Sequence, residues 1–252
     1  MLEEIPVYFY KLKSRYLPHQ FMFRSKKYKA NVAKIVKVTG VDGVVSVSDA
    51  VNLLLSLEQP NFETSVELHV KLAIDPTKSD QFVRSNVVLP HGTGKKVIVA
   101  AFVNAENVQK ALDAGADIAG SEDLVEALKA SGKVNFDKAV AEPEMMRKMA
   151  SIARILGTAG VMPNPKTGTV GDDIAGMIKL IKAGKIDFKN DKTANIHFPV
   201  GKINKDFTVA MLIENIEAGI AAVDSSKPDG VKKKFVSTIH LATSMSPSVR
   251  VR

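Results

Sequence analysis

The sequence predicts an α/β protein of two domains, in which a Rossmann-like three-layer βα domain is inserted into a discontinuous α+β domain. Two observations favour this fold class. Residues 93–157 alternate apolar strands with capped helices, which is typical of a parallel sheet covered by helices. The flanking residues combine helices with strands of alternating apolar and polar side chains, the pattern of half-buried antiparallel strands.

The N-terminal part begins with residues 1–24, a basic extension with interleaved aromatic side chains. The spacing of apolar residues between Tyr28 and Ile35 then predicts a helix, so we expect the folded domain to start at residue 25. Ser48 and Asp49 are expected to cap a second helix, because their side-chain oxygens can accept hydrogen bonds from free backbone N–H groups.

A strand is predicted within FETSVELHVKLAI, residues 62–74, where apolar side chains alternate with polar ones. The polar face of this strand is either solvent-exposed or a binding surface. A second strand, at 83–89, leads into PHGTGKK, and the glycines at Gly92 and Gly94 predict a hinge. The first part of the discontinuous domain therefore covers residues 25–92.

The inserted domain is predicted to repeat a strand followed by a helix three times. The strands are expected at 95–102, 116–120 and 136–141, and the helices at 104–115, 121–132 and 142–157, with Asn104 as one cap. Gly157 and Gly160 predict the second half of the hinge, so the insert is expected to cover 93–157 and the second part of the discontinuous domain 158–252.

The last third of the chain returns to the first pattern. Asp172 or Asp173 is expected to cap a helix, and residues 185–201 are expected to form a hairpin that turns near Asn190 and Asp191. An amphipathic helix at 207–223 and a final strand within 232–244 complete the prediction.

Charge and composition restrict the classes of function. The net charge is +8, while residues 93–157 carry nine acids and nine bases, so a polyanion would meet the flanking parts of the chain. The chain has no cysteine, which excludes disulfides and thiolate metal ligands. Its longest apolar run, 97–103, is far shorter than the roughly 20 residues of a membrane helix, so no membrane partner is expected.

The stretch GVMPNPKTGTV is one substitution away from a phosphate-binding P-loop. Gly160 is followed after four residues by Pro165, Lys166 and Thr167, so proline replaces the second glycine of the motif. Proline has no N–H to offer a phosphate, and the preceding segment is predicted to be a helix rather than a strand. We therefore expect either a stiff loop that presents Lys166 to a polyanion or a plain connector, rather than a nucleotide site.

No pattern in the sequence favours an enzyme. The five histidines, at 19, 69, 91, 197 and 240, do not have the spacing of metal ligands, and no nucleophile with a base can be argued. The insert also lacks the glycine pattern of dinucleotide-binding domains. We expect no catalytic residue, cofactor, metal or small-molecule substrate, and a nucleotide-binding enzyme is the least favoured reading.

The polar strand and several loops of the flanks could share one surface if the two ends of the chain fold together. Structured RNA is recognised by shape and by its backbone and 2′-hydroxyl groups, which small hydroxyl and amide side chains can contact. RNA binding is therefore a hypothesis from the residues alone, beside the simpler interpretation that the basic N-terminal part is a solvated arm.

Four segments of this chain resemble the ribosomal protein L1 family. They are FETSVELHVKLAIDPTKSDQFVRSNVVLPHGTGK, ARILGTAGVMPNPKTGTV, IKAGKIDFKNDKTANIHFPVGK and TSMSPSVR, in the order in which the family has them, and the resemblance runs from about residue 25 to the end. It implies a discontinuous RNA-binding domain, with an inserted Rossmann-like domain on a two-strand hinge.

The resemblance also implies a function without catalysis. The family's first domain binds the stalk helices of large-subunit ribosomal RNA, and the mobile lateral stalk helps deacylated tRNA leave the exit site. Bacterial members also repress their own messenger RNA. The implied partners are therefore large-subunit ribosomal RNA and exit-site tRNA, with its own mRNA as a further candidate. A messenger-binding regulator that acts off the ribosome remains the alternative.

Carried over from the family, the RNA-binding residues lie in four places. They are Phe62, Ser65, Glu67 and His69 on the first strand; Lys166, Thr167 and Gly168 in the proline-rich loop; Lys192 and Thr193 in the expected hairpin; and Ser244, Met245, Ser246 and Pro247 near the C-terminus.

Two departures from the family pattern suggest an organellar member. This chain has LGTAG where the family usually has LGPRG, and SMSPS where the family has TMGPS. Together with the extension at 1–24, these differences lead us to expect a mitochondrial protein, with the bacterial cytoplasm as the alternative.

Overall fold

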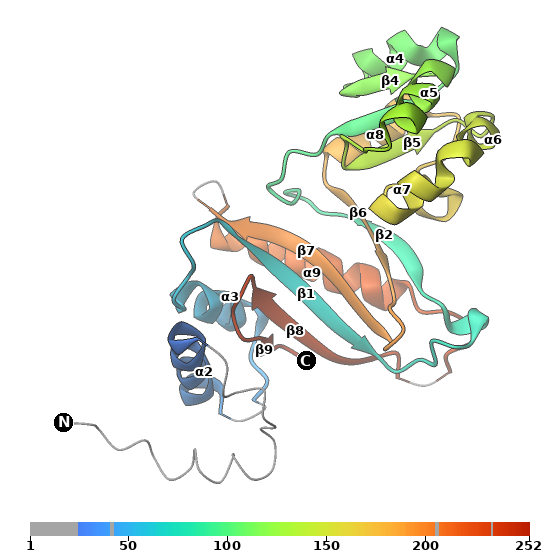
Figure 1. Ribbon diagram of the computed structural model, residues 1–252. Helices are drawn as coiled ribbons and strands as arrows, with labels where there is room; N and C mark the ends of the chain where they lie inside the picture. The colour runs from blue at the N-terminus through green and yellow to red at the C-terminus, as the bar shows by residue number, and fades with distance from the viewer. Residues whose placement is uncertain (1–24, 41–42, 205–206, 233) are drawn as a thin grey trace.

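The computed structural model describes residues 25–40, 43–204, 207–232 and 234–252, so the basic extension predicted at 1–24 lies outside the described residues. The described chain is a mixed α/β protein, as predicted (Figure 1). In chain order its elements are α2 (Lys26–Thr39), α3 (Val47–Ser56), β1 (Thr64–Leu72), η2 (Ser79–Gln81), β2 (Arg84–Val88), β3 (Val99–Phe102), η3 (Ala105–Asn107), α4 (Val108–Asp113), β4 (Ile118–Gly120), α5 (Glu122–Ser131), β5 (Lys138–Ala141), α6 (Met145–Lys148), η4 (Met149–Ile152), α7 (Ala153–Ala159), η5 (Pro165–Thr167), α8 (Ile174–Lys182), β6 (Lys185–Lys189), β7 (Asn195–Ile203), α9 (Val209–Ser225), β8 (Val236–Thr243) and β9 (Val249–Arg250).

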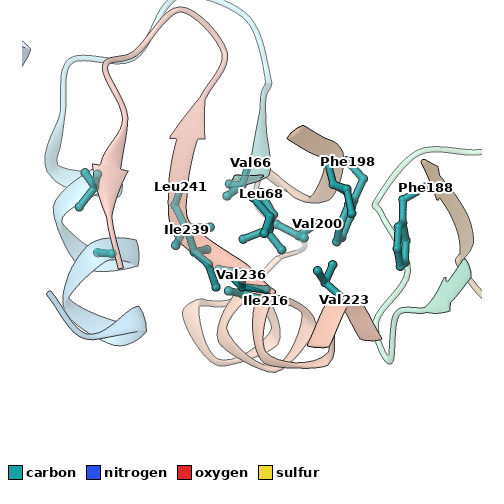
Figure 2. Packing of buried hydrophobic residues seen from close by; sticks show 14 of the residues in the cluster. Val66, Leu68, Phe188, Phe198, Val200, Ile216, Val223, Val236, Ile239 and Leu241 are labelled. Atoms are coloured by element: carbon teal, nitrogen blue, oxygen red, sulfur yellow. The ribbon is translucent and has the colours of Figure 1, made fainter. Parts of the chain in front are cut away.

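The largest sheet has four strands in the order β7-β1-β8-β9, and all neighbours are antiparallel. The alternation seen in the sequence puts Val66 and Leu68 of β1 on one face, where they pack with Ile239 and with Ile216 of α9 (Figure 2). Figure 1 shows α9 running along this sheet. The core cluster extends from Ile35 to Val249, so both ends of the described chain contribute to it.

A second sheet lies in the middle of the chain and has the parallel strand order β4-β3-β5, as the repeated strand and helix pattern predicted. Its strands are apolar on both faces, which is expected of a parallel sheet covered on both sides. On one face Phe102 packs with residues of α5 and α7, and on the other Val99 packs with residues of α4 and α8. The insert is therefore built of three layers.

The insert extends further along the chain than the predicted boundary at residue 157. Leu156 of α7 packs in the same cluster as Phe102, and Ile174 and Ile178 of α8 pack against Val99. From the sequence, α8 was predicted to belong to the flanking domain, because its amphipathic pattern does not reveal which sheet it covers. By its packing, the insert ends near Gly184.

The expected hairpin at 185–201 is wrong, because its two strands pair with different partners. β6 is antiparallel to β2 in a two-stranded sheet, whereas β7 is antiparallel to β1. Asn190 directs this separation: it is 5% exposed, its backbone N–H donates to Val83, and its side-chain oxygen accepts from the backbone N–H of Val83 at 2.8 Å. The chain is thus held on β2 before it turns into β7.

The chain passes between the flanking part and the insert twice, once between β2 and β3 and once between α8 and β6. These two crossing segments meet at Gly92 and Gly184. Both have positive φ, at 63° and 105°, and a Cβ on Gly184 would lie 2.4 Å from the Cα of Gly92. Gly157 and Gly160, which were predicted as hinge residues, lie instead within α7 and at its C-terminal cap. Gly94, at φ 71°, does lie between β2 and β3, as expected of a crossing segment.

A buried amide fastens the first crossing to α9. Asn215 is fully buried, and its side chain accepts from the backbone N–H of His91 at 3.1 Å. It donates to the carbonyls of Gly92 at 2.9 Å and Val200 at 2.8 Å. Asn215 therefore fixes the backbone at His91 and Gly92, where the chain leaves the flanking part.

Two of the predicted helix caps are different in the structure. Ser46, rather than Ser48 or Asp49, caps α3, because its hydroxyl accepts from the backbone N–H of Asp49. Asn104 precedes η3 without a capping hydrogen bond, and its amide donates to Glu144. Asp173 caps α8, as one of the two predicted alternatives.

Candidate nucleic-acid interface

The face of the four-stranded sheet opposite α9 carries polar side chains. The apolar residues of β1 are buried, and the alternating positions Ser65, Glu67, His69 and Lys71 are partly or fully exposed. Because opposed residues of paired strands share a face, these side chains continue onto the neighbouring strands. The alternation in the sequence therefore predicted this surface correctly as the polar side of a half-buried strand.

At one end of this face, the strand β1 meets the turn between β8 and β9. The backbone N–H of Ser65 donates to the hydroxyl of Ser244, and the N–H of Ser244 donates to the carbonyl of Ser65. Phe62 is 55% exposed and Met245 is 80% exposed. The fold thus brings together predicted residues that are about 180 positions apart in the sequence.

The turn between β8 and β9 is held by Ser246. Its hydroxyl accepts from the backbone N–H of Thr243 at 2.9 Å and donates to the carbonyl of Pro247 at 3.0 Å. Met245 has φ 65°, in the region that favours glycine. Pro247 is buried, so of the four predicted residues in this turn it is the one that supports the turn from within.

At the other end of the face, the loop before β7 is organised by Asp191. Its carboxylate accepts from the backbone N–H groups of Asn195 and Thr193, both at 2.8 Å. These hydrogen bonds, led by that of Asn195, lower the pKa of Asp191 to about 2. Lys192 and Thr193, both predicted, are exposed here, and the ammonium group of Lys71 donates to the carbonyl of Thr193.

The proline-rich loop lies with the insert and the β2–β6 sheet. Thr169 accepts from the backbone of Ala141 on β5, and the ammonium group of Lys185 donates to the carbonyl of Gly168 at 3.1 Å. Burial holds the pKa of Lys185 below its ordinary value. Lys166 is exposed on this loop.

Thr167 differs from its predicted role as a surface contact. It is 2% exposed, and its hydroxyl donates to the carbonyl of Asn164 at 3.0 Å. Asn164 in turn caps η5 by accepting from the backbone N–H of Lys166. Thr167 therefore shapes the loop that carries Lys166, and its side chain does not face outward.

Three residues of the polar face were not predicted from the sequence. His197 on β7 and His240 on β8 are the direct neighbours of His69, and Arg250 on β9 is the direct neighbour of His240. The Nδ1 atoms of His69 and His197 lie 2.8 Å apart. Only the strand register reveals this row, because its members are spread over 182 positions of the chain.

Other kinds of site have little support in the described part of the chain. Within residues 25–40, 43–204, 207–232 and 234–252, no group of three His, Cys, Asp or Glu side chains is placed to hold a metal ion. A cavity of about 170 Å³ lies between the loop at Gly160 and the β2–β6 sheet, lined by Arg84, Lys138 and Lys189. It is smaller than the roughly 300 Å³ at which small-molecule pockets begin.

Of the helices that the structure describes, none combines the length and the apolar character needed to cross a membrane.

Comparison with known proteins agrees with the resemblance found in the sequence. The chain is 41% identical over 228 residues to a protein of Kosmotoga olearia named large ribosomal subunit protein uL1, covering 90% of this chain and 96% of that protein. It is 44% identical over 225 residues to the protein of the same name from Deinococcus radiodurans, covering 89% and 94%. For the one from Thermus thermophilus, the identity is 42% over 227 residues, covering 90% and 96%.

A family model matches residues 54–247, a range that begins in α3 and includes the strands β1 to β8, the insert and the turn at Met245. This range contains every residue predicted for the RNA surface. With the match to the model and the identities above, the chain belongs to the ribosomal protein L1p/L10e family.

Proposed function

We propose that this protein is a structural constituent of the large ribosomal subunit that binds ribosomal RNA and performs no catalysis. The observation that carries the proposal is the similarity, over about nine tenths of the chain, to bacterial proteins named large ribosomal subunit protein uL1. The relatives compared above are bacterial, which favours the bacterial cytoplasm and gives no support to the mitochondrial prediction.

The RNA surface that we propose is the uncovered face of the β7-β1-β8-β9 sheet. Its two ends carry different chemistry: exposed apolar side chains at Phe62 and Met245, and hydroxyl and ammonium groups at Lys192 and Thr193. Apolar side chains suit contact with bases and sugars, while the polar groups suit phosphates and 2′-hydroxyls. Lys166, on the loop beside the insert, would add a phosphate contact outside the sheet.

The connection between the insert and the flanking part suits a role in a mobile lateral stalk. The insert joins the rest of the chain through two crossings, which touch at Gly92 and Gly184. Such a narrow connection suits rigid-body motion of the two parts. We propose that the flanking part holds the stalk RNA while the insert is free to move with the stalk as deacylated tRNA leaves the exit site.

The test is a salt titration of binding to a folded stalk fragment of large-subunit ribosomal RNA, beside a scrambled duplex of equal length. We expect a preference for the stalk fragment that persists at high salt, because shape-specific contacts are less sensitive to salt than phosphate contacts. Equal and steeply salt-dependent binding to both RNAs would contradict the proposal. Tighter binding to the protein's own messenger than to the stalk fragment would favour the off-ribosome regulator.

A further inference from the structure

A row of imidazole and guanidinium side chains crosses the four-stranded sheet at one register position. His197 on β7, His69 on β1, His240 on β8 and Arg250 on β9 are successive Cα partners. Opposed residues of antiparallel strands share a face, so all four lie on the polar face described above. At about 4.8 Å between strands, the row is roughly 14 Å long.

A single hydrogen bond joins the first two rings. The Nδ1 atoms of His69 and His197 are 2.8 Å apart, and the rings meet at 62°. A neutral imidazole has one N–H, so one ring must donate its Nδ1–H while the other accepts through its Nδ1 lone pair. The accepting ring then keeps its proton on Nε2, and the donating ring has a bare Nε2.

That bare nitrogen is close to a carboxylate whichever ring donates. Nε2 of His69 lies 3.6 Å from Glu67, and Nε2 of His197 lies 3.7 Å from Asp191. A proton added there forms a cation beside an anion and preserves the Nδ1 hydrogen bond. A second proton would have to occupy the accepting Nδ1 and would break that bond. The pair therefore takes up one proton.

The groups around His69 disfavour a positive charge on its ring. Burial and the neighbouring His197 hold the pKa of His69 below its ordinary value; His240 acts in the same direction, and Glu67 opposes them. The His197 side chain is 49% exposed, against 29% for His69, and it faces Asp191, whose carboxylate is ionised above about pH 3.

Two permanent cations complete the surroundings of the row. Arg250 extends it on β9, and Lys71, on the same strand as His69, bonds to the carbonyl of Thr193 beside the pair. The row thus has a fixed positive charge at one end and a proton-dependent charge at the other, with His240 between them. This is a suitable arrangement for the anionic oxygens of a nucleic-acid backbone.

We propose that the row of His197, His69, His240 and Arg250 is a phosphate-binding subsite for RNA, and that an RNA phosphate bound there is accompanied by uptake of one proton by the His69–His197 pair. The inference rests on the proposed function, because it takes the phosphate to belong to an RNA strand lying across the sheet. An anion stabilises the charged pair, so RNA binding becomes tighter as the pH falls.

The experiment measures the affinity of the full chain for the stalk fragment and for the scrambled duplex between pH 5.5 and 7.5, at fixed ionic strength. Uptake of one proton gives at most a tenfold change in affinity per pH unit, and we expect about tenfold over the whole range. His197→Gln removes one ring of the pair, together with its Nδ1 hydrogen bond to His69, and should make the affinity nearly independent of pH.

Two further variants separate the pair from other histidines. His240→Gln should weaken binding a fewfold at every pH and leave the pH dependence in place. His91→Gln is the control, because His91 lies at the crossing segment and pairs with Glu214. The RNA affinity of this variant should depend on pH in the same way as that of the unchanged chain. A His197→Gln chain with the original pH dependence would overturn the proposal.

The outcomes for this inference and for the proposed function are distinct. A salt-resistant preference for the stalk fragment with no pH dependence would overturn the phosphate subsite and leave the ribosomal function standing. Equal binding to both RNAs, with a pH dependence that His197→Gln removes, would support the subsite and overturn the specific stalk recognition.

Discussion

At the residue scale, the most exposed hydrophobic side chain of the described chain is also held by an unfavourable backbone. Met245 is 80% exposed and has φ 65°. Left-handed backbone costs a residue with a Cβ about 1 kcal/mol, and such outliers cluster at binding sites. We therefore expect Met245→Gly to raise the free energy of unfolding by up to about 1 kcal/mol and to weaken RNA binding.

Urea unfolding and binding to the stalk fragment check this prediction together. Ala194→Gly is the matched control, because Ala194 has φ 60° but is buried, so its replacement relieves the backbone without removing an exposed side chain. If Met245→Gly binds RNA as tightly as the unchanged chain, the exposed thioether has no role in recognition.

Lys166 tests whether the proline-rich loop belongs to the RNA surface. The side chain is exposed on a loop stiffened by Pro165 and by the inward hydroxyl of Thr167. Loss of one phosphate contact lowers affinity and reduces the salt slope by roughly one unit, so we expect this result for Lys166→Ala in the salt titration. Lys129→Ala, an exposed lysine of α5, is the control, and an unaltered slope for Lys166→Ala would remove the loop from the interface.

Single residues were predictable to the extent that their roles depend on local pattern. The alternation around His69 in β1 was sufficient to place its side chain on a polar face. It could not identify His197 or His240 as neighbours, because that requires the register of three strands. Thr167 was assigned outward by resemblance, whereas the hydrogen bonds inside the loop turn its hydroxyl inward.

At the element scale, the contact between the two crossings depends on the absence of side chains. A Cβ on Gly184 would lie 2.4 Å from the Cα of Gly92 and 3.3 Å from the carbonyl oxygen of Leu89. The backbone of both crossings would have to separate, so Gly184→Ala should cost about 3 kcal/mol or more, the sum of left-handed strain and overpacking.

Gly115→Ala is the matched control for this variant. Its φ of 102° is close to the 105° of Gly184, but no atom lies within 4 Å of the added methyl group. It should therefore cost only the backbone strain, about 1 kcal/mol. Thermal unfolding compares the two variants, and equal losses of stability would show that the contact between Gly92 and Gly184 is not tight in solution.

Local pattern predicted most elements but not their partners. The strand at 185–189 was identified, yet its pairing with β2 instead of β7 depends on Asn190, a buried amide that binds Val83 far away in the sequence. The apolar side of α8 was visible too, but whether Ile178 would cover one sheet or the other is a matter of tertiary packing. For this reason the predicted end of the insert was too early.

At the scale of the whole molecule, the flanking part and the insert have separate cores. The cluster around Leu68 and Ile216 comes from both ends of the chain, while Phe102 and Val99 belong to clusters made by the insert. The discontinuous architecture could be predicted from the change of pattern along the sequence. Buried parallel strands are apolar throughout, whereas half-buried antiparallel strands alternate apolar and polar residues. The contact between Gly92 and Gly184 could not be predicted in this way, because glycines occur at many turns.

Separate cores predict that the flanking part can fold and bind RNA without the insert. Because Gly92 and Gly184 are in contact, residues 93–183 can be replaced by two glycines with little change in the span between the crossings. We expect this shortened chain to unfold cooperatively in urea and to keep its preference for the stalk fragment, since the face carrying His69 and Met245 is intact. Its affinity should fall to about that of Lys166→Ala, because the same loop is lost. A shortened chain that folds but binds both RNAs equally would mean that the insert itself takes part in shape recognition.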